Sequence, residues 1–217
     1  MRFSLAGLAA AALLAGCAGT IPRRDYGPDS GLSAVILGGK IILPAGESRE
    51  GSIAINLEGD GGRQASTYRL PLEVGRAKLF LIEPGDYRLL PTRSIFGFRR
   101  DSISVELEGR TLSVPFSREI LRRPAMTIRS KKAHSLGVLV IKINTALPGQ
   151  PASITASLDD GPAARRSAVQ EIIREMMDPN STVEERETAI LWAKPLDDIL
   201  SAIMAEPERR PTFKPSP

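Results

Sequence analysis

The sequence predicts a mainly β fold, a β-sandwich with two C-terminal α-helices packed on it. Three observations indicate this fold. Apolar and polar residues alternate in short segments between residues 33 and 160, turn-forming residues separate these segments, and the apolar spacing changes from two to about 3.6 after residue 160. The 217 residues are enough for one domain with a small appendage. The predicted parts are a signal peptide (1–16), a tether (17–32), a sandwich domain (33–160), a helical appendage (161–205) and a disordered tail (206–217).

Strict alternation identifies three of the strands. Ile53, Ile55 and Leu57 alternate with polar or small residues, and the segments that contain Ile103 and Val114 follow the same rule. One apolar face per strand is typical of sheets that cover a core on one side. Glu108-Gly109 lies between two such runs and predicts a tight hairpin. The predicted strands are 33–37, 52–58, 67–72, 77–82, 87–90, 102–107, 111–116, 136–143 and 153–158.

A local motif, Pro84-Gly85-Asp86-Tyr87, predicts a type II turn followed by a strand whose Tyr87 ring points inward. With the alternating runs that follow, this motif resembles the prealbumin-like sandwich modules, which include carboxypeptidase regulatory-like domains. The resemblance covers about residues 33–116, and the segment from Ser117 has no counterpart in it. It implies a binding or spacer unit and transfers no functional residues.

Helical spacing marks the C-terminal region. Apolar residues recur on one face from Val169 to Met177, between Pro162 and Pro179. Thr182-Val183-Glu184-Glu185 is a capping box that opens a second helix. Pro195 interrupts this helix, and the apolar spacing then continues from Leu196 to Met204. The helices either cap the sheets and complete the core, or offer their Met-containing face to a partner.

The amino terminus has the pattern of an export signal. A basic start, Met1-Arg2-Phe3, precedes a Leu- and Ala-rich run that is too short to span a bilayer. Leu14-Ala15-Gly16-Cys17 resembles the lipobox of bacterial lipoproteins. The resemblance implies cleavage before Cys17, lipidation of its thiol, and several acyl chains such as palmitate that anchor the chain in a lipid bilayer. Ala18, in place of Asp, favours the outer membrane and a body facing the periplasm.

The sequence contains few residues that are typical of catalytic or metal-binding sites. Cys17 is the one cysteine and His134 the one histidine, which argues against an intrachain disulfide and a zinc site. We find no G-x-S-x-G elbow, P-loop or dinucleotide fingerprint. We therefore expect no enzyme activity, no metal and no cofactor. Trp192 falls in the second predicted helix and is expected in the core.

A basic stretch is the best candidate site. Six cations lie within fifteen residues, with one opposing carboxylate, in a chain of net charge +4. They could meet lipid phosphate, lipopolysaccharide or an acidic protein surface, or form a solvated face. Nucleic acid is a poor partner, because aromatic residues are not interleaved with the cations. The stretch consists of Arg118, Arg122, Arg123, Arg129, Lys131 and Lys132.

These observations favour a non-catalytic, membrane-anchored periplasmic lipoprotein that serves as an accessory or interaction subunit, with an envelope protein as partner. The alternative is a module that binds an envelope glycan or lipid. Glycan sites usually present exposed aromatic rings, and this chain has one Trp, three Tyr and six Phe. A hydrolase with an unrecognised site is a third hypothesis.

Overall fold

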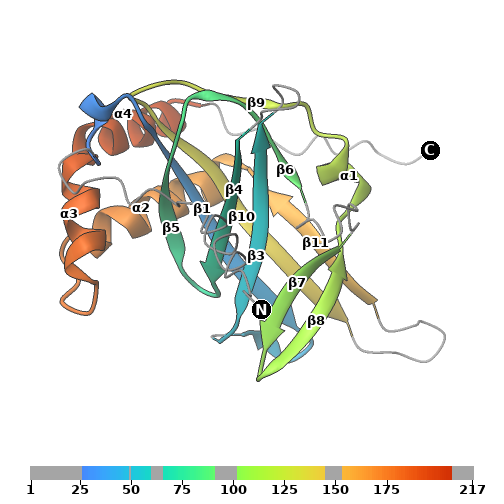
Figure 1. Cartoon of the computed structure of the whole chain (residues 1–217). Coiled ribbons are helices and arrows are strands. Elements are labelled where there is room, and N and C mark those ends of the chain that lie inside the picture. Colours follow the sequence, from blue (N-terminus) through green and yellow to red (C-terminus); the bar gives the residue numbers. More distant parts are fainter. Residues whose placement is uncertain (1–25, 49, 60–65, 91–101, 145–152, 207–217) are drawn as a thin grey trace, which may run out of the picture.

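Strand β1 (Ser33–Leu43) runs through the middle of the molecule and explains its layers. It is buried on both faces over most of its length, so it needs apolar side chains on each side. Val35 and Leu37 point into a core between two sheets, whereas Ala34 and Ile36 belong to a second core under the helices. The computed structural model describes residues 26–48, 50–59, 66–90, 102–144 and 153–206 (Figure 1).

The first sheet, sheet A, is centred on the parallel pairing of β1 with β10 (Ala133–Asn144). The next strand outward, β11 (Ser153–Asp159), pairs with β10 in antiparallel fashion. The opposite edge of β1 pairs with β5 (Ala77–Ile82) along its first half and with β2 (Gly46–Glu47) near its end. Strand β5 is therefore an edge strand of sheet A among the described residues.

The second sheet, sheet B, is built around β3 (Ser52–Gly59), which pairs with β4 along one edge and with β6 and β7 along the other. Strand β8 extends the sheet from β7, and β9 extends it from β6. The bounds are β4 (Thr67–Glu73), β6 (Gly85–Leu90), β7 (Ser102–Leu107), β8 (Arg110–Pro115) and β9 (Met126–Ile128).

The core between the sheets confirms the predicted alternation. Ile53, Ile55 and Leu57 of β3 are almost fully buried in it. The hairpin at Glu108-Gly109 is also confirmed: both residues have positive φ, 49° and 72°, as the primed turn of a two-residue hairpin requires. A mainly β sandwich with helices is therefore the fold of the described chain.

The type II turn predicted at Pro84-Gly85 is wrong. Gly85 does not have the positive φ that this turn needs, and it is already the first residue of β6, opposite Ile128. Strands β5 and β6 belong to different sheets, so the chain crosses between sheets through Glu83 and Pro84. The inward position of Tyr87 is confirmed, and its hydroxyl donates a hydrogen bond to the Glu83 carbonyl at 2.9 Å.

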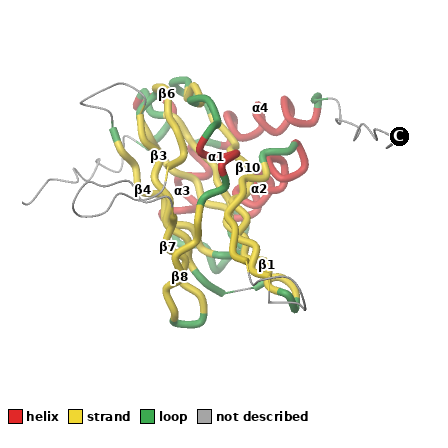
Figure 2. Tube along the Cα trace, turned by 90° about the vertical axis from the view of Figure 1, so that its right-hand side faces the viewer, coloured by secondary structure: helices red, strands yellow, loops and turns green. Residues whose placement is uncertain are grey.

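Three helices, rather than the two predicted, cover the outer face of sheet A: α2 (Pro162–Glu175), α3 (Val183–Leu191) and α4 (Ala193–Met204). Figure 2 shows α2 and α4 on the side of β1 and β10 that faces away from sheet B. The second predicted helix divides at Trp192, which ends α3 and precedes α4. A further short helix, α1 (Arg118–Leu121), follows β8, and a 3-10 turn spans Pro28–Ser30.

The apolar faces of the helices build the second core. Val169, Ile172 and Trp192 are completely buried there, with Leu196 beside them, which confirms the predicted core position of Trp192. Met177 projects into solvent with 86% of its surface exposed. Most apolar residues that were predicted on one face of the helices thus pack in the core. This agrees with the alternative in which the helices cap the sheets, rather than with a free docking face.

Part of the predicted tether is held on the body. The Trp192 indole N–H donates to the Tyr26 carbonyl at 2.7 Å, and the Lys131 N–H donates to the Leu32 carbonyl at 2.9 Å. The signal peptide, Cys17, residues 18–25 and the tail from 207 lie outside the described residues. Among the described helices none is long and apolar enough to cross a bilayer, and the longest, α2, has 14 residues.

Candidate binding groove

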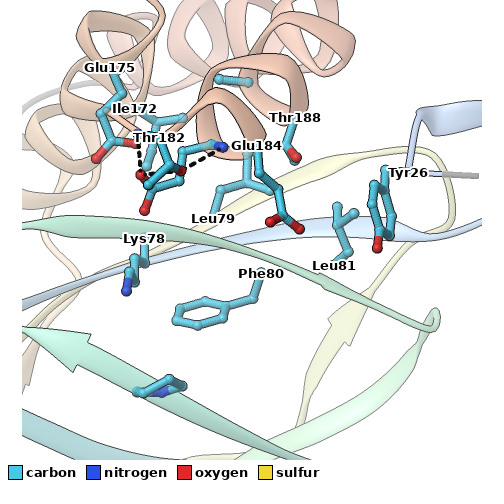
Figure 3. Close-up of a pocket in the computed structure, with 13 residues that line it drawn as sticks. Tyr26, Lys78, Leu79, Phe80, Leu81, Ile172, Glu175, Thr182, Glu184 and Thr188 are labelled. Carbon is cyan, nitrogen blue, oxygen red and sulfur yellow. Dashed lines mark hydrogen bonds between the residues drawn. The ribbon is translucent and has the colours of Figure 1, made fainter. Parts of the chain in front are cut away.

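A groove of about 390 Å³ lies between β5 and the helices α2 and α3 (Figure 3). We call it the β5 groove. Figure 3 shows Lys78, Leu79, Phe80 and Leu81 on its strand side and the helical side chains opposite them. Its lining consists of Tyr26, Pro71, Lys78, Leu79, Phe80, Leu81, Ile172, Glu175, Thr182, Glu184, Glu185, Thr188 and Ala189.

The groove follows the open edge of β5. Neighbouring side chains of a strand point to opposite faces of a sheet, so a hollow lined by four consecutive residues, Lys78 to Leu81, must run along the edge. Leu79 and Leu81 face the helices, and Phe80 packs against the core between the sheets. No other described strand pairs with this edge.

The hydrogen-bond pattern of β1 shows which β5 backbone groups face the groove. The Ala34 N–H donates to the Lys132 carbonyl on the β10 side, whereas the Gly39 N–H donates to the Arg76 carbonyl on the β5 side. Odd-numbered residues of β1 therefore bond toward β5. Since Val35 is opposite Phe80, the N–H and C=O groups of Phe80 point to β1, and those of its neighbours Leu79 and Leu81 point outward.

The helical wall of the groove begins with the predicted capping box, which is confirmed. The Glu185 N–H donates to Thr182 Oγ1 at 3.2 Å, and the Thr182 N–H donates to Glu185 Oε2 at 3.0 Å. The hydrogen bond from Thr182 is the main cause that lowers the pKa of Glu185. The Glu185 carboxylate is therefore ionised and fixed at the start of α3.

A second carboxyl, Glu175, closes the groove at the end of α2. Burial raises its pKa from 4.5 to about 7, and the negative charges of Glu185 and Glu171 add to the effect, while Arg76 and Lys78 oppose it. Glu184 lies on the same wall and is exposed. Three carboxyl groups thus share the helical wall.

One cation, Lys78, lines the groove, and its charge lowers the pKa of Glu175 and of Glu185 without forming an ion pair with either. Lys78 Nζ donates to Glu73 Oε1 at 2.9 Å, so its charge is engaged at the turn before β5. The rest of the strand side is apolar, and Pro71 of β4 completes it. The β5 groove therefore combines apolar side chains, outward backbone groups and an acidic wall.

The predicted basic patch is divided. Arg118, Arg122 and Arg123 lie in or just after α1, whereas Arg129, Lys131 and Lys132 lie beyond β9, in the link to β10. Arg123 binds Asp160, with Nη1 2.5 Å from Oδ2, and also Glu119. Lys131 lies 3.8 Å from Asp29. The remaining members, Arg118, Arg122, Arg129 and Lys132, are exposed.

Arg123 alone among these six cations lines the second hollow, an end cleft of about 740 Å³ between β9, β10 and the start of α2. Arg165 also lines it and pairs with Glu206. His134 accepts a hydrogen bond at Nε2 from the Arg129 N–H at 2.9 Å, and burial is the main cause that lowers its pKa. Both arginines of this cleft are thus paired with carboxylates.

The residues of the β5 groove were not singled out as a site from the sequence, although Thr182 and Glu185 were identified as a helix cap. They come from five separate parts of the chain, so no spacing rule connects them. In the described part of the chain, no group of three or more His, Cys, Asp and Glu is placed to hold a metal ion.

No family model matches this chain, and no curated protein matches its sequence. One similar solved structure is a "putative cell adhesion protein" from Bacteroides ovatus ATCC 8483, at 9% identity and a TM-score of 0.26. The match covers 58% of this chain and 44% of that chain. This chain therefore spans less than half the length of the Bacteroides protein.

Proposed function

We propose that this protein is a non-catalytic interaction subunit of the cell envelope, anchored by acylated Cys17 in the outer membrane and facing the periplasm. The Leu14-Ala15-Gly16-Cys17 motif supports the anchor. The β5 groove carries the interaction role, because an unpaired strand edge beside apolar side chains is a common docking site for another chain.

The proposed anchor lies close to the groove along the chain. Tyr26 lines the groove and follows Cys17 by nine residues. An extended chain of that length spans at most about 30 Å. A partner in the groove would therefore lie within about 30 Å of the lipidated residue, a distance that suits a component of the envelope.

Labelling and crosslinking in cells test this proposal. We expect radiolabelled palmitate to enter the wild-type protein and not Cys17→Ser, and the variant to leave the membrane fraction. A photo-crosslinking residue at Thr188, in the groove, should yield a defined protein adduct. The same residue at exposed Thr111 on β8 is the matched control. Equal labelling of wild type and Cys17→Ser, or equal adducts from both positions, would reject the proposal.

A second role, binding an envelope lipid or glycan, is favoured by one observation in the end cleft. Arg165 Nε is buried there and has no hydrogen-bond partner among the described residues. An anionic headgroup that replaces the Glu206 carboxylate could accept from the Arg165 guanidinium. Vesicles with an anionic phospholipid should then bind the protein more tightly than neutral vesicles, and Arg165→Lys should remove the difference. Equal binding to both vesicles would exclude this role.

A further inference from the structure

We infer that the β5 groove binds an extended segment of a partner protein, with alternating apolar and basic side chains, as an added strand on β5. The inference rests on the proposed interaction role and names the chemistry of the partner. Three features of the groove carry it: the outward backbone groups, the apolar side chains next to them, and the acidic wall.

The two open edges on this side of the sandwich differ in their protection. Strand β4 carries Pro71, which has no N–H to offer, between exposed Arg69 and Glu73. Proline and charges are the usual means of blocking an edge. Strand β5 has no proline within Ala77–Ile82, and its one charge, Lys78, is bonded to Glu73. The β5 edge is therefore open to pairing at Leu79 and Leu81, whereas the outward N–H of Ala77 already donates to the Glu171 carboxylate.

The arrangement of the outward backbone groups favours an extended strand, rather than a helix, as the bound segment. Leu79 and Leu81 each present an N–H and a C=O outward, at the two-residue spacing with which an added strand forms its hydrogen bonds. Side chains of such a strand alternate between the α3 side and the Pro71 side of the groove. One row would thus lie near Glu184 and Glu185, and the other near Phe80.

The negative charge of the helical wall favours basic side chains on the row of the added strand that faces α3. The Glu185 carboxylate is fixed by the capping box, and Glu184 forms no ion pair with another described residue. A Lys or Arg that enters from an added strand would find the Glu184 carboxylate without having to displace a paired cation. Glu185, in contrast, already interacts with the charges of Lys78 and Arg76. An acidic segment would meet repulsion at the same place.

A peptide of the same length as β5, with alternating Val and Lys, is the probe. The full mature chain is titrated with this peptide and with a Val-Glu peptide, and amide exchange is followed by NMR. We expect the Val-Lys peptide to bind and the Val-Glu peptide not to bind. The bound Val-Lys peptide should slow amide hydrogen exchange at Leu79 and Leu81 by at least about tenfold. The exchange rate at Phe80 should not change, because its N–H already faces β1. Equal binding of both peptides, or unchanged exchange at Leu79 and Leu81, would overturn the inference.

Two variants on α3 separate the acidic wall from general charge effects. Glu184→Lys should weaken binding of the Val-Lys peptide by about fivefold. Glu187→Lys, which makes the same change at an exposed residue outside the groove, should leave it nearly unchanged. Both residues are exposed, so the fold should persist in each variant. Equal weakening by both variants would overturn the role of the wall.

The remaining outcomes distinguish other occupants. Self-association that the Val-Lys peptide reverses would assign the edge to a second copy of this chain and contradict a separate partner. A large gain in peptide affinity on changing Arg23 and Arg24 to Gln would assign the groove to the chain's own tether. Failure of the peptide with intact palmitate labelling and Thr188 adducts would reject the strand-addition mechanism and leave the proposed function standing.

Discussion

Glu175, a carboxyl group in the β5 groove, should make the free energy of unfolding depend on pH. Burial and the nearby carboxylates raise its pKa from 4.5 to about 7 in the folded protein. Below pH 4.5 both folded and unfolded chains hold the proton, and this group favours neither state. As the pH rises toward 7, the unfolded chain loses the proton first, so the free energy of unfolding falls.

The size of the effect follows from the same pKa. A pKa change from 4.5 to about 7 corresponds to a ceiling of about 3 kcal/mol. Glu175 is only partly buried, and solvent screens its charge, so we expect about 1 kcal/mol. Glu175→Gln should therefore stabilise the protein by about 1 kcal/mol more at about pH 8 than at about pH 4.

Urea denaturation followed by Trp192 fluorescence measures this difference, because Trp192 is the one tryptophan and is buried under the helices. The control is Glu187→Gln, an exposed carboxyl on α3 outside the groove. A constant difference between Glu175→Gln and wild type across the pH range would refute the reasoning. The same pH trend in Glu187→Gln would refute it equally.

Four further substitutions test the fold. Trp192→Phe removes the hydrogen bond to Tyr26 and leaves a cavity in the second core, so it should cost about 2 kcal/mol in urea denaturation followed by circular dichroism. Thr182→Ala removes the helix cap beside the groove and should cost about 1 kcal/mol by the same assay. Gly137→Ala should prevent stable folding, because its Cβ would lie 2.0 Å from a backbone oxygen and its φ is +91°. Gly46→Ala, with φ +130° and no atom within 4 Å, carries strain alone and should cost only about 1 to 2 kcal/mol. Equal losses at the two glycines would contradict the steric argument.

Features with a local cause could be predicted from the sequence. The Thr182 capping box depends on residues three apart, and the Glu108-Gly109 turn depends on two neighbours that accept positive φ. Alternation located the strands for the same reason, since each strand buries one face of its own segment. Strand β1 is the exception, because burial on both faces removes the alternation, and only its first part was predicted.

Features that depend on sheet membership could not be predicted in this way. Pro84-Gly85 favours a turn between paired strands, but β5 and β6 lie in different sheets and the chain crosses between them. The basic stretch is continuous in sequence, yet the strand β9 interrupts it between Arg123 and Arg129, and only Arg123 lines the end cleft. The β5 groove joins residues as distant as Tyr26 and Thr188, so it arises only from the tertiary fold.

The open β5 edge follows from the layered architecture itself. Because β1 is buried on both faces, the helices must cover sheet A, and α3 comes to lie beside its edge strand. A helix satisfies its own backbone groups, so it can shield a strand edge but cannot pair with it. The outward groups of Leu79 and Leu81 thus remain unpaired by any described strand, and the α3 cap places its carboxylates beside them. The same packing that completes the second core creates a sheltered, acidic and unpaired edge, which is the geometry that strand addition requires.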